Sequence, residues 1–135
     1  MISVAKNVRV VSAEICRGER YLITQRGAKA VLPLLWEFPG GRVRDDETDA
    51  TALRRCLRDR IGVDATVGDR LLEVEHSYPD WTVTLVVYRC DIGAQEPWPA
   101  KVAAVAWVSL DELSSYPFPG ADQRTLEQLL RGDAG

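Results

Sequence analysis

Residues 41–63 read GRVRDDETDATALRRCLRDRIGV, and the spacing of polar, apolar and glycine positions in this stretch decides the fold that we predict. Thr48 is a suitable N-cap, because its hydroxyl can accept a hydrogen bond from a backbone N–H in the first turn of a helix. Gly62 stands where the end of a helix favours glycine. The apolar side chains between them recur at helical spacing, and they are Ala52, Leu53, Cys56, Leu57 and Ile61. The stretch therefore predicts a polar loop and then a helix that packs one apolar face against another layer.

Short segments rich in β-branched and aromatic residues flank this predicted helix. Residues 8–15, 20–25 and 36–38 are predicted strands before it, and residues 71–75, 81–90 and 102–108 are predicted strands after it. Pro39, Gly40 and Gly41 are expected to end the third strand, and residues 42–47 to form a loop. A helical turn at 111–113 and a closing helix at 122–130, with Asp122 as its N-cap, follow. The order β-β-β-α-β-β-β-α predicts one layered α/β domain, of the α+β kind, over residues 1–135.

Composition excludes several classes of protein. The chain has 135 residues, 46% hydrophobic and 27% charged, which is typical of a single globular domain. Its net charge of −3 disfavours binding to long nucleic acids, which require a broad basic surface. Three cysteines without a CxxC pair, and one histidine, argue against a disulfide framework and a zinc site. No run approaches 18 apolar residues and residues 1–10 lack a long apolar core, so we expect a cytoplasmic protein without a membrane span or signal peptide.

The stretch at 41–63 also resembles the Nudix box, G-x5-E-x7-R-E-U-x-E-E-x-G-U, where U is aliphatic. The matches fall without a gap, at Gly41, Glu47, Arg55, Leu57, Gly62 and Val63. The flanking segments LWEFPGG at 35–41, SYPDWTVTLVVY at 77–88, EPW at 96–98 and PFPGADQRTL at 117–126 are similar to those of MutT and the CTP pyrophosphohydrolases. The resemblance implies the Nudix fold, a mixed β-sheet sandwiched between helices, and a ligand that is a nucleoside di- or triphosphate or a related diphosphate.

The box departs from the family at the positions that hold metal. Cys56, Asp59 and Arg60 stand where the family has glutamates, and their spacing places all three on one helix face. The family's cofactor is Mg2+ or Mn2+, and hard cations bind several oxygen ligands. A thiol is a soft ligand and a guanidinium has no lone pair to offer. By resemblance, the carbonyl of Gly40 and the carboxylates of Asp59 and Glu47 are the remaining candidate ligands for any metal.

The resemblance also assigns residues to catalysis and to the ligand. Glu47, Arg55 and Asp59 match the catalytic positions in weakened form. The positions near the nucleobase and the phosphates are Arg26, Phe38, Asp80 and Asp122. Lys101 falls where MutT carries a further metal-binding glutamate, so Arg60 and Lys101 are predicted to be cations that contact the phosphates directly.

Each of the box residues has a simpler interpretation as well. Cys56 fits a small buried hydrophobic residue, and Glu47 with Arg55 fits a structural ion pair as well as a catalytic one. Asp59 could pair with Arg55, and Arg60 could lie in solvent at the helix end.

Three functions therefore compete, and no particular oligomeric state is predicted. The first is a nucleotide-binding Nudix domain with weak or lost pyrophosphohydrolase activity. The second is an active, metal-dependent enzyme whose metal site is rebuilt with Glu37 or Glu75. The third is a non-catalytic interaction module that retains the fold.

Overall fold

The computed structural model describes residues 6–29, 34–79 and 81–116. Before the main helix, the strands are β1 (Lys6–Glu14), β2 (Cys16–Arg17), β3 (Arg20–Gln25), β4 (Trp36–Glu37) and β5 (Gly40–Arg42). The main helix is α1 (Asp49–Ile61), and it is followed by β6 (Thr66–Tyr78), β7 (Trp81–Asp91), β8 (Ala104–Ser109) and the short helix α2 (Leu110–Leu113). The order confirms strands on both sides of the main helix, with five strands before it where three were predicted. The predicted closing helix at 122–130 lies outside the described residues.

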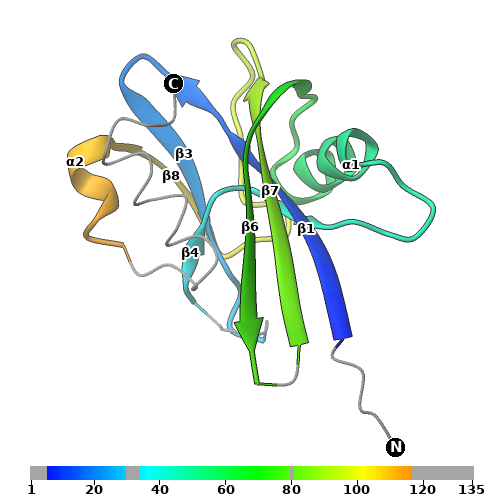
Figure 1. The fold of residues 1–135 in the computed structure, drawn as a ribbon. Helices are drawn as coiled ribbons and strands as arrows, with labels where there is room; N and C mark the ends of the chain where they lie inside the picture. The colour runs from blue at the N-terminus through cyan, green and yellow to red at the C-terminus, as the bar shows by residue number, and fades with distance from the viewer. Residues whose placement is uncertain (1–5, 30–33, 80, 117–135) are drawn as a thin grey trace, which may run out of the picture.

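The strands form two four-stranded sheets. The first has the order β5-β1-β7-β6, in which β1 and β7 run parallel and the other neighbours run antiparallel. In the second, β3 pairs with β2, β4 and β8, all antiparallel. Figure 1 shows α1 and α2 on opposite sides of the strands, so the mixed α+β architecture predicted from the sequence is confirmed.

Local signals in the sequence explain where α1 begins and ends. The hydroxyl of Thr48 accepts a hydrogen bond from the N–H of Thr51, and Gly62 takes a left-handed conformation with φ 68°. Glycine adopts that conformation without the steric cost that a Cβ would bring. All the apolar side chains predicted from helical spacing are buried, and all of them except Cys56 belong to the core cluster that contains Val11 and Ala13 of β1. The N-terminal turn is further tied to the first sheet, because Asp49 accepts hydrogen bonds from Arg9 and from the hydroxyl of Tyr88.

The predicted third strand ends before Pro39, as expected, but Gly40 and Gly41 then begin a new strand that the sequence did not predict. Residues 40–42 form β5, which pairs antiparallel with β1. The lack of side chains permits this approach: a Cβ on Gly40 would collide with the carbonyl oxygen of Val11 and come within 2.7 Å of the Cα of Ser12. The two glycines therefore serve as a strand that lies against β1 and beside α1.

The strand predicted at 71–75 is longer in the structure. β6 covers Thr66–Tyr78 and pairs with β7 along its length, with irregularities between Val67 and Arg70 and between Arg70 and Leu72. Gly68 and Asp69 disfavour a strand locally, and pairing with β7 overrides that preference. No helix in the described residues is long and apolar enough to cross a membrane.

Candidate functional site

Glu47 and Arg55 form a bidentate ion pair that fastens the loop of the box to α1. Arg55 donates from Nε to Oε2 of Glu47 at 2.7 Å and from Nη2 to Oε1 at 2.8 Å. The same Oε1 accepts the backbone N–H of Arg44 at 3.0 Å, and Arg55 also donates to the carbonyl of Arg42. These bonds lower the pKa of Glu47 to about 2. Both carboxylate oxygens are thus committed to holding the loop, and the group is a weak base.

Arg60 does not extend into solvent at the end of α1. Its side chain folds back toward β5, where Nη1 donates to the carbonyl oxygen of Gly40 at 2.8 Å. A Cβ on Gly41 would lie 3.0 Å from both Cζ and Nη2 of Arg60 and 2.7 Å from Sγ of Cys56. The guanidinium therefore lies against the bare backbone of β5, next to the thiol.

Cys56 is a buried, neutral member of this group. It is 1% exposed, and burial raises the pKa of its thiol although Arg60 and Arg55 oppose that shift. This is the environment of a small hydrophobic side chain rather than of a reactive thiolate.

A second pair of charges lies close to Arg60. Arg26, directly after β3, places Nη1 3.5 Å from Oε1 of Glu37 on β4. Burial raises the pKa of Glu37, and the positive charges of Arg26 and Arg60 counteract part of that rise. Two cations therefore act on one partly buried carboxylate, which leaves the cluster with a net positive charge when all three groups are ionised.

The loop before β8 closes the C-terminal end of α1. The backbone N–H of Trp98 donates to the carbonyl of Ile61 at 3.1 Å, and that of Lys101 donates to the carbonyl of Arg60 at 3.0 Å. Lys101 and Arg60 are the two cations predicted to contact the phosphates, and this hydrogen bond joins their backbones. Lys101 is exposed.

The remaining predicted site residues are not gathered at this cluster in the described structure. Phe38 is 2% exposed and packs in a core cluster with Ile23, Val108 and Leu113. Asp59 is exposed on α1 and forms no ion pair with another described residue, since Arg55 binds Glu47 instead. Glu75 is exposed on β6. Asp80 and Asp122 lie outside the described residues.

The donor atoms at the box do not fit a divalent metal ion. The Gly40 carbonyl is occupied by the guanidinium of Arg60, which would repel a cation, and the Glu47 oxygens are taken by Arg55 and Arg44. Within the part of the chain that the structure describes, no three His, Cys, Asp or Glu side chains form a group that could hold a metal. Of the three candidate ligands, only Asp59 retains an uncommitted carboxylate among the described contacts.

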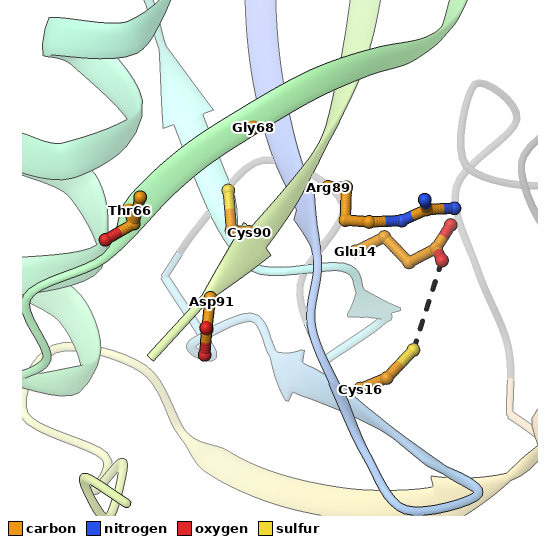
Figure 2. Close-up of a pocket in the computed structure, with 7 residues that line it drawn as sticks. All are labelled: Glu14, Cys16, Thr66, Gly68, Arg89, Cys90 and Asp91. Carbon is orange, nitrogen blue, oxygen red and sulfur yellow. Dashed lines mark hydrogen bonds between the residues drawn. The ribbon is translucent and has the colours of Figure 1, made fainter. Parts of the chain in front are cut away.

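A separate pocket of about 430 Å³ lies at the ends of β1 and β7, and its lining contains none of the box residues (Figure 2). It is lined by Glu14, Cys16, Thr66, Gly68, Arg89, Cys90 and Asp91. Burial raises the pKa of Glu14, and the charge of Arg89 counteracts it. This pocket was not predicted from the sequence, although Glu14 in the predicted strand at 8–15, whose other residues are mainly apolar, was a signal that could have indicated it.

Comparisons with known proteins give the family to which this fold belongs. The family model described as NUDIX domain matches residues 10–128. The CTP pyrophosphohydrolase of Escherichia coli is 32% identical over 93% of this chain and 93% of its own length. A putative 8-oxo-dGTP diphosphatase 2 of Mycobacterium tuberculosis is 34% identical over 93% of this chain and 89% of its own.

Solved structures give the same result. The ORF135 protein of E. coli superposes with a TM-score of 0.79 at 31% identity, covering 94% of this chain and 91% of that one. The MutT NUDIX hydrolase of Burkholderia pseudomallei superposes with a TM-score of 0.82 at 26% identity, covering 92% and 98%. The gap-free box, the architecture and these matches together show that the chain belongs to the Nudix family and is similar to its MutT-like hydrolases.

Proposed function

We propose that this chain is a MutT-like Nudix domain that binds a nucleoside di- or triphosphate and hydrolyses it weakly or not at all. The observation that carries the proposal is the hydrogen bond from Arg60 to the Gly40 carbonyl. By resemblance to the family, both positions belong to the metal site, and here one is a cation bonded to the other.

The chemistry of hydrolysis explains why an arginine at a position of the family's metal site matters. Cleaving a phosphoanhydride bond requires an activated water and neutralisation of the growing negative charge, and a bound metal ion can supply both. A guanidinium can supply the second but not the first, because it has no lone pair with which to accept a proton from water. Glu47 is a poor substitute as a general base, since its pKa is about 2 and its oxygens are already hydrogen-bonded.

The class of ligand is supported by the relatives and by the charges at the box. The names of the two relatives refer to CTP and 8-oxo-dGTP, which share a nucleoside and a chain of phosphates. In this chain Arg26 and Arg60 act on the same carboxylate, and Lys101 lies in the loop that closes α1. These cations suit an anionic ligand of that class better than a neutral one.

The test restores the family's glutamates through the triple change Cys56→Glu, Asp59→Glu and Arg60→Glu. With Mg2+ and CTP or dGTP as substrates, we expect release of pyrophosphate to rise at least ~100-fold over wild type, because metal activation contributes several kcal/mol. Arg58→Glu is the matched control, since Arg58 is exposed on the last turn of the same helix and pairs with Asp64.

Three results would contradict the proposal. The first is a wild type that turns over as fast as the folded triple variant. The second does not depend on the variant: a wild-type kcat of about 1 s⁻¹ or more with Mg2+, which is ordinary for an enzyme, would favour the active enzyme with a rebuilt metal site. Absence of nucleotide binding with and without Mg2+ would favour the interaction module.

A further inference from the structure

We infer that the guanidinium of Arg60 is the pyrophosphate-binding group of this domain, so that nucleotides bind without a metal ion. The inference rests on the proposed function and deepens it, because it names the atoms that hold the ligand and the cofactor that binding does not need. It concerns Arg60, the backbone of Gly40 and Gly41, and the neutral side chain of Cys56.

The guanidinium is held in place yet keeps most of its hydrogen-bonding capacity. Of its five N–H donors, one is used on the Gly40 carbonyl at 2.8 Å, and this is the only side-chain hydrogen bond that Arg60 makes within the described residues. The contact with Gly41 orients the group further, since a Cβ there would come 3.0 Å from Cζ. A fixed arginine loses little further conformational entropy when it binds an anion.

Position 56 contributes no negative charge to pair with Arg60. Cys56 and Arg60 are four residues apart on α1, the spacing at which a glutamate and an arginine would form an ion pair along the helix. A buried thiol cannot do so, because burial keeps it protonated. The change from the family's glutamate to cysteine and the presence of arginine at 60 therefore act together to leave a cation available.

The end of the helix would otherwise repel a phosphate. Exposed carbonyls at a helix C-terminus carry partial negative charge. Here the carbonyls of Ile61, Arg60 and Arg58 each accept a backbone N–H, from Trp98, Lys101 and Gly62 respectively. These bonds reduce the repulsion that an anion beside Arg60 would meet.

The arrangement offers an anionic ligand two cations that act on the same carboxylate. A planar guanidinium binds two oxygens of one phosphate at once. Arg26 acts on Glu37 from 3.5 Å, and the charge of Arg60 also reaches Glu37. In the inferred site, a ligand with two or more linked phosphates can engage both cations.

The experiment is isothermal titration calorimetry with two probes, inorganic pyrophosphate and CTP, each in EDTA and in Mg2+. We expect both probes to bind wild type in EDTA, with a Kd that changes by less than ~3-fold on adding Mg2+ and weakens as salt rises. Arg60→Ala should weaken binding of both by at least ~10-fold, as removal of a charged hydrogen-bonding group does. Arg58→Ala, an equal loss of charge on the exposed side of the same turn, should leave the Kd unchanged.

A second variant guards against a change in folding. Arg60→Gln keeps an amide that can donate to the Gly40 carbonyl but removes the charge, and it should also lose affinity while its thermal unfolding stays close to wild type.

The possible failures separate the two proposals. Binding seen only with Mg2+, or unchanged in Arg60→Ala, overturns this inference and leaves nucleotide binding intact. Binding in EDTA together with rapid hydrolysis in Mg2+ overturns the proposed loss of activity. No heat of binding for either probe in either buffer overturns both.

Discussion

The variant Gly41→Ala, which adds one methyl group, tests whether β5, α1 and the guanidinium of Arg60 pack as described. In Gly41→Ala, the new Cβ would lie 2.7 Å from Sγ of Cys56 and 3.0 Å from Cζ of Arg60. Optimal contacts between such atoms are roughly 3.5 Å or longer, so the thiol must retreat by about 0.8 Å. The φ angle of Gly41 is not in the left-handed region, so alanine fits the backbone of β5 and the clash alone opposes it.

The loss of stability in Gly41→Ala depends on which side chains can move away from the new Cβ. Arg60 is flexible and can swing away, whereas Cys56 is 1% exposed in a close-packed core. Overpacking a core costs about 1–3 kcal/mol. Alanine also restricts the unfolded chain, which returns about 0.4–1 kcal/mol. We therefore expect Gly41→Ala to lower the free energy of unfolding by about 1–2 kcal/mol.

A double-mutant cycle identifies the cause. Cys56→Ala removes Sγ and leaves a small void, at a cost of about 1 kcal/mol. In the double variant the new Cβ occupies part of that space, so the combined loss should be smaller than the sum of the single losses by at least ~0.5 kcal/mol. Urea unfolding followed by tryptophan fluorescence measures all four proteins, with equal m-values as the sign that only stability has changed. Losses that add to within ~0.3 kcal/mol would refute the packing of Gly41 against Cys56.

Two further predictions concern the strands and the start of the helix. Gly40→Ala should unfold the domain or cost more than Gly41→Ala in a urea titration, because its Cβ would strike backbone atoms of Val11 that cannot swing away; a stable variant would show that β5 is not seated on β1. Asp49→Asn should lower the free energy of unfolding by about 2 kcal/mol at pH 7, allowing for solvent exposure of Arg9, since it loses the charge that binds Arg9 and Tyr88. The folded-state pKa of Asp49 is lowered from 3.8, so this contribution is present above that value and fades as pH falls below it; a wild-type advantage that persists unchanged at pH 2 would contradict the assignment.

The helix of the box could be predicted because its signals are local. The Thr48 cap, the Gly62 end and the apolar spacing between them act within one segment, and all of them are present in the structure. The strands β3 and β4 were predicted for the same reason, since turn residues and alternating side chains delimit them.

The parts that could not be predicted depend on distant partners. The strand β5 exists because β1 offers an edge on which two glycines can lie, and nothing within residues 40–42 signals that partner. The first five residues of β6 include Gly68 and Asp69, which β7 holds in a strand against their own preference. The direction of Arg60 belongs to the same class: helical position alone allows solvent or β5, and only the Gly40 carbonyl decides between them.

Side chains of the box join helix, loop and strand directly. Arg55 joins α1 to its own loop through Glu47 and the Arg42 carbonyl, and Arg60 joins α1 to β5 through the Gly40 carbonyl. The buried apolar face of α1 packs in the core and further fixes the position of the helix. These contacts join helix, loop and strand through protein groups alone. Under the proposed function, the fold therefore accommodates a positive charge at position 60, where the family pattern has glutamate, and the exchange would alter the chemistry of the site rather than its packing.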